Sequence, residues 1–234
     1  MLIAAHIFAG ALLGLVVWRL ANDRRAVPFC MAGSILPDLI DKPLGLVLPS
    51  VLPGGRTVFH ALIIVVIILL CIFFLARSRS RWLGAGVACA VLLHQVLDEM
   101  WTLPVNWLYP LLGPFQGHMI PDYIGTYFWV EMSDPSEWMF MIGSVTILAL
   151  SYPSLSVILR ICRSDRLKTG AYTFLAMVFL VTGGYLVIAG ITSNAPTFIT
   201  PLYSGLPSVM AGLLALCGTF GMSREIVSSR RNVS

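Results

Sequence analysis

Charge is scarce in this chain. Only 11% of its 234 residues are charged, whereas 58% are hydrophobic. A soluble domain typically carries about 25% charged residues, so the composition excludes an ordinary soluble domain and predicts an integral membrane protein. The length favours one helical bundle rather than several domains.

The chain also lacks paired cysteines and a basic leader. Its five cysteines lie scattered in apolar segments without a C-x-x-C spacing, which is typical of small buried residues rather than of a disulfide framework. No basic segment precedes the first apolar run. We therefore expect that run to be a retained span and not a cleaved signal peptide.

Long apolar segments are plentiful. Because a helix rises about 1.5 Å per residue, about 20 apolar residues cross a hydrocarbon core of about 30 Å. The second candidate is short and holds Pro37, which should kink or end its helix, so it is either a crossing or a re-entrant segment. Seven candidates result: 2–18, 26–40, 57–76, 82–99, 137–161, 170–191 and 205–222.

The basic residues predict the orientation of these spans. With seven crossings, only Lys42 and Arg56 fall on one side, and 13 of the 15 basic residues fall on the other. Cytoplasmic loops are the basic ones. We therefore predict an all-α polytopic transmembrane bundle of about seven spans, with its amino terminus outside and its carboxyl terminus in the cytoplasm. The 13 are Arg19, Arg24, Arg25, Arg77, Arg79, Arg81, Arg160, Arg163, Arg166, Lys168, Arg224, Arg230 and Arg231.

The predicted outer side holds all four histidines and most acids. It also holds the longest non-spanning stretch, residues 100–136, which is rich in Trp, Tyr, Pro and Gly. A loop of this length is either a cover over a site or, through its aromatic residues, a belt at headgroup level. Four polar residues near this loop are expected to be ordinary surface: His118, Asp122, Glu131 and Glu137.

His94 and Asp98 form the strongest local motif. Residues four apart share a helix face, so this imidazole and carboxylate either reach a common ion or form a hydrogen bond inside the bundle. His60 opens the third span, four residues after Arg56, and is either a ligand or an interfacial histidine. His6, in the first span, is either a ligand or simply packed.

Asp38 and Asp41 lie three residues apart, where the second helix is expected to end near Pro43. Two acids at a carboxyl-terminal helix end oppose the helix dipole, so a cation there is physically favourable. The alternative is helix termination, with Asp41 solvated or paired with Lys42.

The histidines also share one depth. His6, His60 and His94 each lie three to five residues inside their spans, within roughly 8 Å of the same boundary. Imidazole and carboxylate ligands suit zinc first, with manganese or iron as alternatives. We therefore predict a divalent metal site from the following residues: His6, Asp38, Asp41, His60, His94 and Asp98. Glu99 is a candidate base, and Arg56 is either an anion clamp or the ion-pair partner of Asp41 or Glu99.

These motifs carry a family resemblance. The order His6…Gly10, Gly33-Ser-Ile-Leu-Pro-Asp38, Arg56-x-x-x-His60 and His94-x-x-x-Asp98 resembles the membrane-bound metal-dependent hydrolase family typified by the inner-membrane protein YdjM. This resemblance covers about the first 115 residues. The same order of motifs is also similar, more loosely, to that of zinc-dependent phospholipases C. Where the family often has a second Asp and a Ser or Thr, this chain has Ile40 and Ala61.

The resemblance implies a metal-dependent hydrolase-like membrane core at residues 1–115. The pattern of apolar segments adds an external loop at 116–136 and three further transmembrane helices at 137–234. We expect a multi-pass protein of the cell membrane with its site facing outside the cytoplasm, acting on a lipid ester or phosphoester. Membrane lipids are the expected partners, and nucleic acid is not one. The rival hypotheses are a proton- or ion-coupled transporter, in which His and Asp form a relay, and a non-catalytic membrane scaffold.

Overall fold

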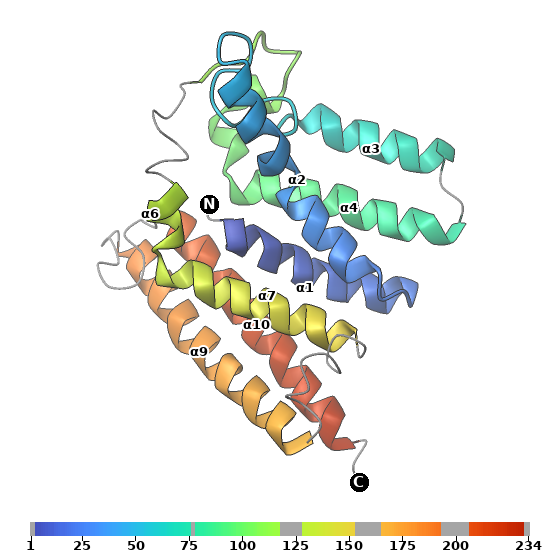
Figure 1. Cartoon of the computed structure of the whole chain (residues 1–234), viewed down its shortest axis with the longest axis vertical. Coiled ribbons are helices and arrows are strands. Elements are labelled where there is room, and N and C mark those ends of the chain that lie inside the picture. The colour runs from blue at the N-terminus through green and yellow to red at the C-terminus, as the bar shows by residue number, and fades with distance from the viewer. Residues whose placement is uncertain (1–2, 76–77, 118–127, 153–164, 193–205, 232–234) are drawn as a thin grey trace. The chain divides into compact units, whose positions relative to one another are not determined.

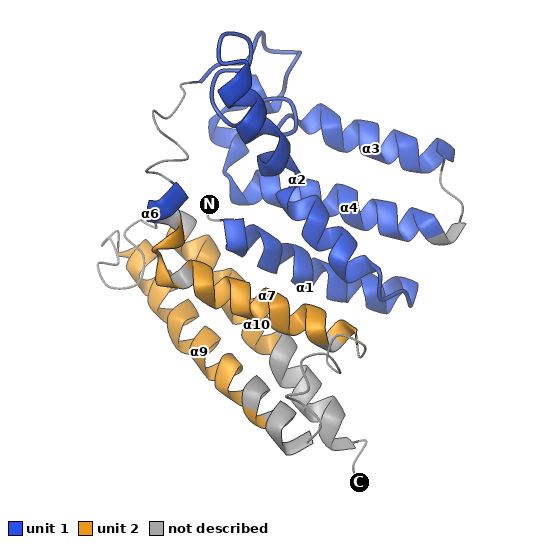
Figure 2. Cartoon of the chain, in the orientation of Figure 1, with its two compact units in different colours: residues 1–130 blue, residues 131–234 orange. Residues whose placement is uncertain are grey.

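The computed structural model of the protein describes residues 3–75, 78–117, 128–152, 165–192 and 206–231. Within these ranges the chain is helical and contains no strand. It divides into two compact units, Met1–Val130 and Glu131–Ser234 (Figure 2). The expected all-α class is therefore confirmed.

The first unit is built on three packed helices, α1 (Ile3–Ala21), α2 (Ala26–Val47) and α4 (Ser78–Leu97), with α3 (Leu62–Leu75) packed on α4 (Figure 1). Glycines let α1 and α2 approach closely. A Cβ atom on Gly14 would lie 2.5 Å from Val27 Cα, and one on Gly10 would lie 2.6 Å from the Cys30 carbonyl oxygen. Small residues at such crossings are typical of helices that pack within a bilayer.

Helix α2 differs from its prediction. It runs without interruption from Ala26 to Val47, with Pro37 and Pro43 inside it, so the expectation that the helix ends at these prolines is wrong. Each proline removes only one backbone donor, and neighbouring helices make this tolerable in membrane bundles. Asp38 and Asp41 are consequently interior helix residues rather than residues at its carboxyl end.

Helix α3 also begins later than predicted. Residues 57–61 form turns, and the helix starts at Leu62. His60 therefore lies in a turn ahead of α3, outside the apolar helix. Most of α3 is exposed and apolar, including Leu70, Phe73 and Phe74, as expected of a surface that faces lipid.

Short helices follow α4. These are the 3-10 helix η1 (Met100–Thr102) and α5 (Pro104–Trp107), and later α6 (Phe128–Met132). They occupy the stretch predicted to be a long external loop, of which residues 118–127 lie outside the described ranges.

The second unit contains α7 (Pro135–Ser151), α9 (Asp165–Ile191) and α10 (Leu206–Arg231). Helices α9 and α10 pack against each other, and the Ser208 hydroxyl donates to the Leu186 carbonyl between them at 2.8 Å. Glu137, expected at the surface, is buried in this unit.

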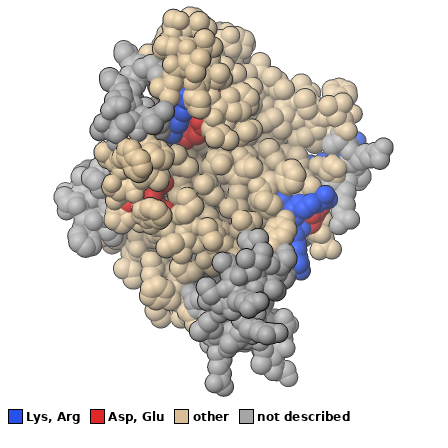
Figure 3. All heavy atoms as spheres, viewed as in Figure 1, with Lys and Arg blue, Asp and Glu red and all other residues tan. Residues whose placement is uncertain are grey.

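Three helical segments in the described residues are long and apolar enough to cross a membrane: Ile3–Ala21, Ser80–Leu97 and Thr173–Ile191. Three shorter apolar helices accompany them: Leu62–Leu75, Glu137–Ala149 and Ser208–Phe220. The face of the molecule in Figure 3 is consistent with this, since its described charged side chains form only a few small patches.

Candidate metal centre

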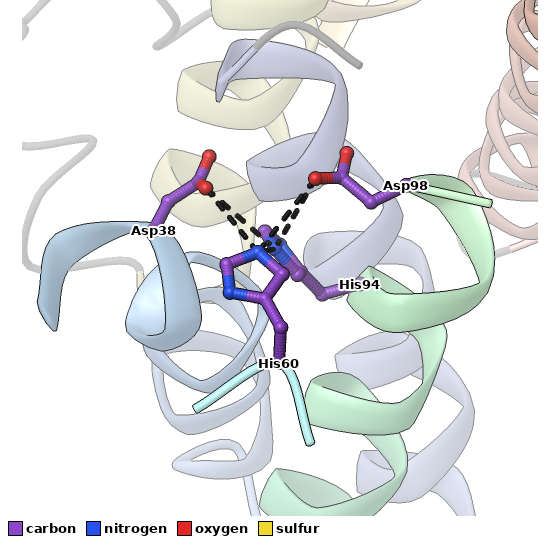
Figure 4. A group of neighbouring side chains, drawn as sticks. All are labelled: Asp38, His60, His94 and Asp98. Atoms are coloured by element: carbon purple, nitrogen blue, oxygen red, sulfur yellow. Dashed lines mark hydrogen bonds and ion pairs between the residues drawn. The ribbon is translucent and has the colours of Figure 1, made fainter. Parts of the chain in front are cut away.

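Four buried side chains converge inside the first unit. Asp38 comes from α2, His60 from the turn ahead of α3, His94 from the last turn of α4, and Asp98 from the residue that directly follows α4. One nitrogen or oxygen atom of each lies within 4.8 Å of the others. Figure 4 shows the two carboxylates approaching the two imidazoles from opposite sides.

The spacing of these atoms suits a small cation. The Nε2 atoms of His60 and His94 are 3.0 Å apart, and Asp38 Oδ1 is 3.5 Å from the first and 3.9 Å from the second. Asp98 Oδ2 lies 3.7 Å and 4.0 Å from the same two nitrogens. A regular tetrahedron of ligands at about 2.0–2.1 Å from zinc has edges of about 3.3 Å, so small adjustments bring all four atoms into range.

The hydrogen bonds made by the Nδ1 atoms of His60 and His94 determine where the lone pairs of the two Nε2 atoms point. His94 Nδ1 lies 2.7 Å from the Ser34 carbonyl oxygen, which only accepts, so this nitrogen donates. His60 Nδ1 lies 2.8 Å from Asp41 Oδ2 and donates to it. The two Nε2 atoms therefore direct lone pairs at each other, and this contact requires a positive charge between them, either a proton or a metal ion.

The surrounding acids favour positive charge at this point. Burial lowers the pKa of His60, but the nearby carboxylates of Asp38, Asp41 and Asp98 outweigh burial and raise the pKa to about 10. In addition, Asp38 Oδ1 is buried and accepts no hydrogen bond within the described part of the chain. An acceptor without a donor and two facing lone pairs fit a divalent ion, and the mixed N/O ligands suit zinc, manganese or iron.

Asp41 lies behind His60 and outside this group of four. Its carboxylate accepts from the backbone N–H groups of Thr57 at 2.9 Å, Phe59 at 3.0 Å and His60 at 3.1 Å, besides the His60 ring. It is fully buried. Asp41 therefore fixes both the ring and the backbone of His60.

His6 lies beside the group. Its Nε2 atom is 3.0 Å from Asp98 Oδ1, and its ring centroid is 4.0 Å from that of His94, with the planes inclined by 35°. The structure brings His6 into contact with two members of the group without making it the fifth member.

Two cations each hold one carboxylate of the group. Lys42 Nζ lies 2.9 Å from Asp38 Oδ2, and Arg56 Nε lies 3.1 Å from Asp98 Oδ2. The ion-pair partner of Arg56 is thus Asp98. The alternative expectation, an ion pair with Asp41 or Glu99, is wrong. The Arg56 side chain is 41% exposed whereas that of Asp98 is only 3% exposed, so the guanidinium marks the open side of the centre.

Glu99 follows Asp98 in a left-handed backbone conformation, with φ of 55°. This conformation costs a residue other than glycine on the order of 1–2 kcal/mol. Its Oε1 atom is buried and has no hydrogen-bond partner in the described residues. The carboxylate is adjacent to the centre in sequence but is not one of the four.

Sequence reasoning missed three contributors to this site: the Ser34 carbonyl, Lys42 as partner of Asp38, and Gln95. Asp38 and Lys42 lie four residues apart and therefore share a helix face. A prediction that the helix continues past Pro37 would have revealed this pair. Gln95 carried a signal as well, because an amide inside an apolar helix needs partners.

His118 and Asp122 lie outside the described residues, as does the side chain of Glu131.

An apolar helical bundle that encloses imidazoles and carboxylates around one point defines a class, the integral membrane proteins with a buried candidate metal centre. The chain belongs to the YdjM inner membrane protein family, which matches residues 1–195. The match continues past residue 115, where the motif-based resemblance ended. No curated protein and no solved structure matches the chain.

Proposed function

We propose that this protein is a metal-dependent hydrolase of the membrane that cleaves a lipid ester or phosphoester. The observation that carries the proposal is the buried group Asp38, His60, His94 and Asp98, with an orphaned carboxylate oxygen and two facing imidazole lone pairs. Buried ionisable groups are costly in a membrane protein and persist where they are partnered or used.

The four residues of this group would hold the divalent ion. Bound there, the ion supplies a Lewis acid and lowers the pKa of water towards about 7. Asp41 and the Ser34 carbonyl hold the Nδ1 atoms of His60 and His94, which keeps both Nε2 atoms facing the centre. Glu99 is proposed as the base, because its buried Oε1 atom has no hydrogen bond among the described residues.

Arg56 is proposed to bind the anionic part of the substrate. A guanidinium has five N–H donors and no lone pair for a metal. The Nε donor serves Asp98, and the side chain is 41% exposed, so the outer N–H groups can donate to a phosphate in the planar arrangement that arginine favours.

The membrane placement is also part of the proposal. Seven crossings, with 13 of the 15 basic residues on the cytoplasmic side, put the centre near the outer surface at headgroup depth. Cysteines introduced at Asp122 and Ser229, in a chain without native cysteines, test this in intact cells. An impermeant reagent should label position 122 alone, and labelling of 229 alone would move the centre to the cytoplasmic side.

The decisive experiment combines metal analysis with a lipid assay. The purified protein should contain about one divalent ion or more per chain and release product from mixed phospholipid vesicles, with loss of activity on chelation and recovery on adding zinc or manganese. Asp38→Asn should lose both metal and activity. Ser144→Ala, which removes a buried hydrogen bond to the Phe140 carbonyl in the second unit, should retain both.

Two outcomes contradict the proposal. A folded protein that takes up no divalent ion removes the metal mechanism. Proton or ion flux in proteoliposomes, without hydrolysis of any lipid, would favour the transporter instead.

A further inference from the structure

Gln95 is a fully buried amide with three partners. Its Nε2 atom donates to the carbonyl oxygens of Phe59 at 3.4 Å and Ala61 at 3.2 Å, and its Oε1 atom accepts from Trp107 Nε1 at 3.0 Å. The orientation of the amide is fixed, because an indole N–H only donates and carbonyl oxygens only accept.

These contacts hold the residues on either side of His60. The segment 57–61 is not helical, so its backbone groups need partners from elsewhere. The Asp41 carboxylate accepts from N–H groups of this segment, and the Gln95 amide donates to its carbonyl groups. His60 is thus held between an acceptor on α2 and a donor on α4.

The same segment is fixed to helix α5. Trp107 reaches it through Gln95, and its neighbour Asn106 donates from Nδ2 to the Arg56 carbonyl at 2.9 Å. Asn106 is 4% exposed and also bonds both the N–H and the carbonyl of Gln116. Consecutive residues of one short helix therefore secure both Arg56 and the neighbours of His60.

We propose that Gln95 is a positioning residue of the metal centre, which places His60 for the ion and connects it to α5 through Trp107. This inference rests on metal binding by the proposed centre. A residue that only stabilised the bundle would change the unfolding temperature without changing the geometry of a bound ion. A positioning residue changes the coordination itself.

Cobalt(II) is a suitable probe, since its visible spectrum reports the number and geometry of ligands. Gln95→Glu keeps the size of the side chain and the acceptor for Trp107, but it turns a carboxylate towards two carbonyl oxygens. We expect cobalt still to bind, with Kd raised by about 10–100-fold, the usual range for partners of metal ligands, and with an altered visible spectrum. Trp107→Phe removes the indole N–H together with the five-membered part of the ring, leaves the Gln95 side chain itself intact, and should produce a smaller change in the same direction.

Ser208→Ala is the matched control, because it deletes a buried side-chain hydrogen bond to a backbone carbonyl in the second unit. It should keep the wild-type Kd and spectrum. If Gln95→Glu does not fold, Gln95→Met and Trp107→Phe make the same comparison.

Wild-type spectra and Kd values in all the Gln95 and Trp107 variants, with only the stability lowered, would overturn the positioning role and leave the metal centre standing. Failure of the wild-type protein to bind cobalt would instead overturn the metal centre, and this inference with it.

Discussion

Replacing Asp41 by asparagine tests whether Asp41 orients His60 or binds the metal itself. Four donors meet this carboxylate, namely the backbone N–H groups of Thr57, Phe59 and His60 and the His60 Nδ1 atom. Asparagine has the same shape but no charge, and a hydrogen bond to a charged acceptor contributes about 1 kcal/mol more than one to a neutral acceptor. The free energy of unfolding should therefore fall by about 4 kcal/mol.

The metal should be retained by Asp41→Asn, but more weakly. Loss of the carboxylate that orients a metal-bound imidazole usually reduces affinity about 10–100-fold. Chemical unfolding in detergent measures the first effect, and competition with a chromophoric chelator measures the second. Asp38→Asn is the contrast, since it should lose the metal while changing the stability of the metal-free protein much less. Complete metal loss at unchanged stability in Asp41→Asn would make Asp41 a ligand and refute this reasoning.

Three further predictions follow from the same contacts. His94→Ala and Asp98→Ala should each lose bound metal while the helical content seen by circular dichroism is retained; stoichiometric metal in both variants would remove His94 and Asp98 from the ligand set. Arg56→Lys keeps the charge but not the planar fork, so it should bind metal normally and hydrolyse phosphorylated lipid at least about tenfold more slowly; unchanged turnover, or metal loss, would favour a structural ion pair. Because the pKa of His60 is raised from 6.5 to about 10, the metal-free protein should lose stability as the pH rises from about 6.5 to about 10, while metal binding strengthens. Thermal unfolding of the metal-free chain across this range measures the effect, and stability that is flat or rises with pH would contradict it.

The sequence was sufficient to find the candidate residues because ligand chemistry leaves a local signature. His94 and Asp98 share a face at i,i+4 spacing, and Asp38 is an acid within an apolar run. The helical class followed from the length of the apolar segments in the same way. Both inferences depend only on neighbours along the chain.

The roles within the site could not be obtained in this way. Asp41 and Asp38 are equivalent in sequence, and only the packing of the turn at residues 57–61 gives one of them the backbone N–H groups and the other an orphaned oxygen. Helix α2 was predicted too short because local propensity penalises Pro37, whereas the bundle tolerates it. The contact of Gln95 with Trp107 joins side chains whose packing no periodicity specifies.

The turn that carries His60 has a consequence for assembly. Its hydrogen bonds come from Asp41 on α2 and Gln95 on α4, so an inserted but unpacked set of helices contains no such turn and no candidate metal centre. Helices in membranes insert first and associate afterwards. A divalent ion would bind only the associated state and would stabilise it by mass action, so the metal supply of the cell would influence how much of the inserted chain reaches its packed form.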